Sequence, residues 1–113
     1  DQVEHISLAK KADLCLVAPA TANIIGKIAC GIADDMATTV IMALERAPVF
    51  ICPAMNTNMY QNPIVQRNIK TLKELGYHFI EPRESRLACG DLGKGALADV
   101  EVIVDTVEKY LEG

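Results

Sequence analysis

The sequence predicts an α/β fold in which helices flank a parallel β-sheet. Three short apolar runs alternate with longer segments of helical periodicity. Two of these runs, residues 14–18 and 49–52, are apolar throughout, as strands covered on both faces are, and a weaker run spans residues 77–80. Half of the 113 residues are hydrophobic but only 4% are aromatic, so aliphatic side chains supply the core. Strands that alternate with helices are joined by right-handed crossovers and therefore lie parallel.

The helix expected between the second and third strands has both of its ends marked. Asn62 is a typical N-cap, Pro63 suits the first helical position, and Gly76 follows the last turn. One apolar stripe joins these two ends and consists of Val65, Ile69, Leu72 and Leu75.

Further helices are expected before and after it. Residues 22–47 are too many for one helix, and Gly31 with Asp34 and Asp35 indicates a break. The second half, residues 36–44, has almost no charged face, which is typical of a buried helix and favours a subunit interface. Asp99 predicts the N-cap of a last helix. The inner face of that helix would hold Ile103, Val107, Tyr110 and Leu111.

Charge and cysteine content exclude several classes of function. Fifteen acidic and 11 basic residues give a formal charge of -4 without any block of like charges, which argues against nucleic acid or an anionic membrane as a partner. No apolar stretch is long enough for a transmembrane span. The four cysteines form no C-x-x-C pair and have no histidine at ligand spacing. Neither a metal site nor a disulfide framework is therefore expected, and the cytoplasm is the simpler location.

Three loops follow the predicted strands, over residues 19–23, 53–60 and 88–95. Ligands of open parallel sheets bind at the carboxyl ends of the strands, so these loops form the expected site. Thr21 and Asn23 can hydrogen-bond the edge of a flat ligand, and Asn56 can donate to a carboxylate without adding a charge. Both loops also have a structural alternative. Residues 19–23 alone are better explained as a strand-to-helix turn with Thr21 as N-cap, and Asn56 is about equally well explained as a helix cap.

Cys89 differs from the other three cysteines. Cys15 and Cys52 lie in predicted strands and Cys30 in an Ala-rich helix, where inert packing is expected. Cys89 lies among glycines and charges, where a thiol can be a proton donor or nucleophile, the alternative being an ordinary exposed thiol.

The two histidines and the late glycines are less informative. His5 falls in a short helical pattern with Leu8 and Ala12, and for both His5 and His78 a surface or core role is the usual one. The glycines of residues 90–95 lack the spacing of a dinucleotide fingerprint.

Taken together, these segments resemble the homo-oligomeric flavin-containing cysteine decarboxylases. The resemblance covers nearly the whole chain, with its motifs in family order and at family-like spacing. It is carried by His5-Ile6-x-Leu8, Ala12-Asp13, Pro19-Ala20-Thr21-Ala22-Asn23, Pro53-Ala54-Met55-Asn56-x-x-Met59-Tyr60 and Ala88-Cys89-Gly90-x-x-Gly93-x-Gly95. The last motif is most similar to members that act in coenzyme A biosynthesis on a phosphorylated cysteinyl small molecule.

The resemblance implies a flavodoxin-like or Rossmann-like subunit in a trimer or dodecamer, with FMN between subunits. In the family, the substrate thiol is oxidised to a thioaldehyde, carbon dioxide leaves, and the enethiolate is reduced to the aminothiol. By matching position, His5 would be the catalytic base, Cys89 the proton donor and Asn56 the carboxylate anchor, with Met59 shaping the pocket. The flavin ring would lie near Thr21, Ala22, Asn23, Ile24 and Met55.

The family's first βαβ unit, which supplies the FMN phosphate site, has no counterpart in the sequence. Residues 1–113 are therefore expected to be the C-terminal part of a single flavoprotein domain. The alternatives are a peptidyl-cysteine decarboxylase of lantibiotic maturation, and a non-catalytic relative that binds flavin or inhibits a phosphatase. The joint presence of His5, Asn56 and Cys89 favours an enzyme.

Overall fold

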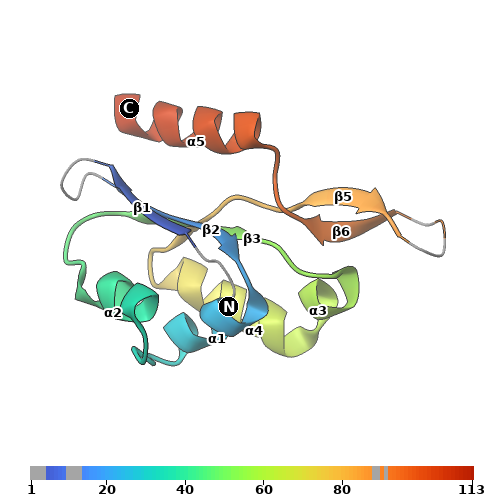
Figure 1. Cartoon of the computed structure of the whole chain (residues 1–113), viewed down its shortest axis with the longest axis horizontal. Coiled ribbons are helices and arrows are strands. Elements are labelled where there is room, and N and C mark those ends of the chain that lie inside the picture. Colours follow the sequence, from blue (N-terminus) through green and yellow to red (C-terminus); the bar gives the residue numbers. More distant parts are fainter. Residues whose placement is uncertain (1–4, 10–13, 88–89, 91) are drawn as a thin grey trace.

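The computed structural model describes residues 5–9, 14–87, 90 and 92–113, with the backbone alone for residues 5–9. Its centre is a four-stranded sheet of order β1-β2-β3-β4 (Figure 1). β3 (Val49–Pro53) runs parallel to β2 (Leu14–Ala20), and β4 (His78–Phe79) runs parallel to β3. The predicted α/β fold with a parallel sheet is thus confirmed.

Helices cover both faces of this sheet. On one side lie α1 (Ala22–Ala29), α2 (Met36–Ala43), the short α3 (Thr57–Gln61) and α4 (Pro63–Glu74). Of the helices in the described residues, only α5 (Val100–Glu112) lies on the other side, as Figure 1 shows. None of the helices in the described ranges is long and apolar enough to cross a membrane.

Each face of the sheet has its own apolar cluster, and β3 contributes to both. Val49 and Ile51 belong to the cluster under α1, α2 and α4, whereas Phe50 and Cys52 belong to the cluster under α5. This alternation follows from the two-residue period of a strand. Coverage on both faces explains why β3 is buried at every position and apolar throughout.

Local capping chemistry sets the helix ends much as expected. Asn62 Oδ1 accepts the Ile64 N–H at 2.8 Å, and Pro63 begins α4. The Asp35 carboxylate accepts the Thr38 N–H at 2.8 Å while the Thr38 hydroxyl accepts the Asp35 N–H at 3.2 Å, which forms a capping box for α2. The Thr38 N–H, and the Thr38 hydroxyl that also donates to Asp35 Oδ1 at 2.7 Å, lower the pKa of the Asp35 carboxyl.

The structure corrects the expectation of a helical pattern around His5. That residue begins β1 (His5–Ala9), which pairs antiparallel with β2, so that His5 lies opposite Ala18. An unpaired edge of β2 would leave a row of backbone donors and acceptors without partners, and β1 satisfies them.

The structure also corrects three details of the helices and loops. Asp99 occupies the N-cap position of α5, but its carboxylate lies 3.4 Å from Arg83 Nε and makes no capping bond. Leu75 and Leu111, expected on inner faces, are largely exposed because each lies at a helix end. Much of the predicted polar loop is a hairpin of β5 (Arg83–Arg86) and β6 (Leu92–Ala96).

Candidate functional site

The loops that follow β2 and β3 lie side by side at the carboxyl edge of the sheet. Ala20 pairs with Pro53 at the ends of the two strands, and the Ala54 N–H donates to the Ala20 carbonyl at 3.0 Å. This confirms that the first two predicted loops meet at one edge, since parallel strands end on the same side.

The β5–β6 hairpin joins this edge through β6. The Met55 N–H donates to the Gly95 carbonyl at 2.9 Å, and β6 lies against α3. Gly93 and Gly95 are both buried at this contact. Three segments far apart in sequence therefore meet: the β2–α1 loop, the β3–α3 loop and β6.

Most of the residues expected beside a flavin lie in the β2–α1 loop and the first turn of α1. The Thr21 hydroxyl accepts the Ile24 N–H at 3.2 Å, so the predicted N-cap role is confirmed. Ala22 is half-buried and Asn23 is exposed in the first turn of α1. The Ile24 side chain is 1% exposed in the core, so only its backbone can face a ligand at this edge.

Asn56 caps α3 and keeps a free amide group. Its Oδ1 accepts the Met59 N–H at 2.8 Å, which confirms the structural alternative. The side chain is exposed, and its Nδ2 donates to no residue in the described part of the chain. A cap uses only the oxygen, so both N–H donors remain for an anionic ligand. Met59 is also exposed, and Met55 is half-buried against the larger core cluster.

His5 and Cys89 complete the set of sequence-predicted residues. The backbone of His5 lies opposite Ala18 and hence near the carboxyl end of β2, the same edge as the loops. Cys89 lies outside the described residues, between β5 and β6 of the hairpin.

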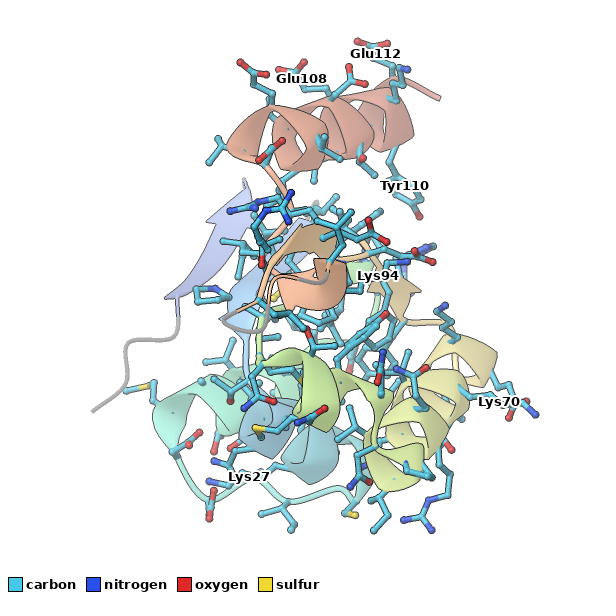
Figure 2. All side chains as sticks on the ribbon, turned by 90° about the vertical axis from the view of Figure 1, so that its right-hand side faces the viewer. Lys27, Lys70, Lys94, Glu108, Tyr110 and Glu112 are labelled. Atoms are coloured by element: carbon cyan, nitrogen blue, oxygen red, sulfur yellow. The ribbon has the colours of Figure 1, made fainter. Side chains whose placement is uncertain are left out.

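Two ion pairs hold the base of the hairpin. Lys94 Nζ lies 2.5 Å from Glu81 Oε1 (Figure 2 labels Lys94), and Arg83 Nε lies 3.4 Å from Asp99 Oδ1. The Lys94 ammonium lowers the pKa of the Glu81 carboxyl, and the carboxylate in turn raises the pKa of Lys94. Such exposed pairs contribute little to stability.

Gly93 and Gly95 of β6 belong to the last motif of the resemblance, but their close contacts with the β3–α3 loop and α3 were not predicted from the sequence. A Cβ atom on Gly93 would lie 2.5 Å from Thr57 Oγ1, and one on Gly95 would overlap the Met55 carbonyl oxygen. The sequence does carry a signal for this contact. Alternate residues of a strand face the same side, so the two glycines of Gly93-Lys94-Gly95 would leave one side of a strand without side chains and allow another segment to approach it closely.

A separate cavity of about 360 Å³ lies at the opposite, amino edge of the sheet. Its lining includes Arg46, Val49, His78 and Tyr110. It is therefore remote from the meeting point of the loops. Among the described residues, no group of three or more His, Cys, Asp or Glu side chains could hold a metal ion.

The cysteines differ in exposure, and this gives a first prediction. Cys15 and Cys52 are fully buried, as predicted, whereas Cys30 is exposed at the end of α1, which corrects its expected packing. Burial raises the pKa of Cys52 to about 11 and that of Cys15 above 9.0. As the pH rises above about 9, these two thiols ionise in the unfolded chain but stay protonated in the native protein. Ionisation therefore stabilises the unfolded state, and the free energy of unfolding should decline above about pH 9.

Thiol labelling at pH 8 in a Cys89→Ser background checks the burial of Cys15 and Cys52 on which this prediction rests. Ellman's reagent should label Cys30 rapidly and Cys15 and Cys52 only after denaturation, because the reagent needs an accessible thiolate. Equal labelling rates for all three thiols in the native protein would contradict the burial described.

Comparisons with known proteins agree with this geometry. The Flavoprotein family matches residues 1–112. A probable phosphopantothenoylcysteine decarboxylase from Streptococcus mutans is 53% identical over 110 residues, which cover 96% of this chain and 62% of that protein.

Two solved structures are also similar. A cysteine-to-serine variant of PPC decarboxylase, complexed with pantothenoylaminoethenethiol, has a TM-score of 0.81 and 43% identity over 87% of this chain and 54% of its own. The FMN binding protein AtHal3 has a TM-score of 0.78 and 45% identity over 86% of this chain and 53% of its own.

The chain spans between about half and two thirds of the length of these three proteins. The family match extends over β1 to α5, including the loops at the carboxyl edge and the hairpin. On this match, the chain belongs to the Flavoprotein family.

Proposed function

We propose that this chain is part of an FMN-dependent phosphopantothenoylcysteine decarboxylase. It would convert 4′-phosphopantothenoylcysteine to 4′-phosphopantetheine in coenzyme A biosynthesis. The observation that carries the proposal is the meeting of three segments at one sheet edge, through the Ala54–Ala20 and Met55–Gly95 backbone hydrogen bonds. The decarboxylase names of the Streptococcus mutans relative and of one solved structure support this substrate.

The residues of the β2–α1 loop fit a flavin. Pro19 and Ala22 are half-buried and carry no long side chain, so a flat ring can approach the backbone beside them, and Asn23 offers an exposed amide to the polar edge of the ring. Thr21, Ala22, Asn23, the Ile24 backbone and Met55 would hold FMN. When bound, FMN would supply two-electron oxidation and reduction of the substrate. The name of AtHal3 supports this choice of cofactor.

The chain's own residues would position the substrate and move protons. Two N–H groups on Asn56 Nδ2 would bind the substrate carboxylate without an added positive charge, so that the carboxylate is held but remains able to leave as carbon dioxide. Met59 would line the pocket next to this anchor. His5 would act as the base for the substrate thiol, and Cys89 would donate the proton that completes the aminothiol.

A competition between two substrates tests this proposal. The purified protein is supplied with FMN, freed of excess by gel filtration, and offered phosphopantothenoylcysteine and a peptide ending in cysteine. We expect flavin absorbance to elute with the protein and only the phosphorylated compound to lose carbon dioxide. Decarboxylation of the peptide alone would favour the lantibiotic alternative, and bound flavin without turnover would favour a non-catalytic relative.

We also propose that the protein is a cytoplasmic homo-oligomer, either a trimer or a dodecamer, and that α2 lies in the subunit interface. In α2 only Thr38 and Ile41 are buried, whereas Met36 is 80% exposed and Met42 is 44% exposed. The helix has no charged residue, so its solvent-exposed face is uncharged and partly apolar, as subunit interfaces are. The described cysteines are free thiols, which fits a reducing compartment.

Replacing Met42 with Glu should dissociate the oligomer, because a buried unpaired charge costs several kcal/mol. Light scattering after gel filtration measures the mass. Leu75→Glu is the matched control, because Leu75 is 68% exposed at the C-terminal end of α4 rather than on α2. This variant should leave the oligomer intact. An oligomer unchanged by Met42→Glu and Met36→Glu would remove α2 from the interface.

A further inference from the structure

We infer that Gly93 and Gly95 are positioning residues that seat the hairpin on the first turn of α3 and thereby fix the Asn56 amide. The role of Asn56 as carboxylate anchor rests on the proposed function. The seating itself rests only on the contacts between β6 and the β3–α3 loop.

Gly95 provides the closer of the two contacts. Its carbonyl accepts the Met55 N–H at 2.9 Å, and a Cβ atom in its place would overlap the Met55 carbonyl oxygen. The residue also has φ of +153°, a backbone conformation that side chains disfavour. Because the clashing atom belongs to the backbone, no side-chain change nearby can relieve it.

Gly93 provides a second contact of a different kind. A Cβ atom there would lie 2.5 Å from Thr57 Oγ1 and 2.8 Å from Leu87 Cδ1. Thr57 is the first residue of α3 and directly follows Asn56. The clash involves side-chain atoms only. The end of the flexible Leu87 side chain can rotate away, so removing the Thr57 hydroxyl should relieve the contact that remains.

Seating on α3 leaves the hairpin little freedom at its base. The pairs Arg83–Asp99 and Lys94–Glu81 join the two flanks of the hairpin to each other, whereas the hydrogen bond from Met55 to Gly95 joins β6 to the β3–α3 loop. The direction of the Asn56 side chain depends on the same turn, since its Oδ1 is bound to the Met59 N–H. A displaced β6 would therefore displace the anchor.

Four variants of the protein expressed from its complete gene test this inference: Gly95→Ala, Gly93→Ala, Thr57→Ala and the double variant Gly93→Ala/Thr57→Ala. Gly76→Ala is the matched control, because Gly76 has φ of +100° but open space around its Cβ position. Hydrogen exchange at the Met55 amide reports seating, and KM and kcat for phosphopantothenoylcysteine report the anchor.

For Gly95→Ala and Gly93→Ala we expect exchange at Met55 to accelerate about tenfold or more and KM to rise about tenfold. Thr57→Ala and Gly76→Ala should leave both quantities near the wild-type values. The double variant should restore both the exchange rate at Met55 and KM to near the wild-type values. If Gly93→Ala acted only by lowering overall stability, the second substitution would not restore them.

Unchanged Met55 exchange in Gly95→Ala, or a double variant no better than Gly93→Ala, would overturn the seating. A normal KM in variants with accelerated exchange would overturn its link to Asn56. A wild-type protein without decarboxylase activity would refute the proposed function, whereas the exchange measurements would still decide the seating.

Discussion

Asn56→Asp should lower kcat/KM for phosphopantothenoylcysteine by about 100-fold or more while leaving thermal stability near that of the wild type. The aspartate oxygen can still accept the Met59 N–H that Asn56 Oδ1 accepts now, so the cap of α3 is kept. The two amide donors are lost and a negative charge faces the substrate carboxylate. Juxtaposed like charges cost several kcal/mol, which is more than enough for a 100-fold effect.

The control for this variant is Asn62→Asp. Asn62 also caps a helix through its Oδ1, which accepts the Ile64 N–H at the start of α4 at 2.8 Å, but it lies at the other end of α3 from Asn56. It should change neither stability nor activity appreciably. A near-normal kcat/KM in Asn56→Asp would show that Asn56 is only a helix cap.

Cys89→Ser should separate loss of carbon dioxide from formation of the final product. Serine is a far weaker acid than cysteine, so a proton donor at this position would be lost while the carboxylate anchor remained. Carbon dioxide should form, and an enethiol product should accumulate in place of the aminothiol. A cysteine-to-serine variant of PPC decarboxylase is complexed with pantothenoylaminoethenethiol, a compound of this type.

Mass spectrometry of the products measures this separation, with Cys30→Ser as the control because Cys30 is exposed at the end of α1. That control should give the normal aminothiol. A normal aminothiol yield from Cys89→Ser would remove Cys89 from the reaction.

Local chemistry made much of the fold predictable. Asn62, Pro63 and Gly76 mark the ends of α4 because capping and proline geometry act within one turn. β2 and β3 were equally clear, since strands covered on both faces must be apolar at nearly every position. The edge where the loops meet followed from the parallel direction of these strands.

Contacts between distant segments were not predictable in the same way. β1 forms because its backbone hydrogen-bonds the edge of β2. The sequence of residues 5–9 alone does not indicate this pairing. The hairpin is polar and glycine-rich, so it lacks the apolar alternation that marks a strand. Gly93 and Gly95 owe their importance to Thr57 and Met55, more than 35 positions earlier in the chain.

The most direct test of the central claim uses substrate labelled isotopically in the cysteine carboxylate. The FMN-loaded protein should release labelled carbon dioxide and 4′-phosphopantetheine in equal amounts, with neither product formed in the absence of FMN. Flavin bound to a protein that releases no labelled carbon dioxide would contradict the proposed decarboxylase activity.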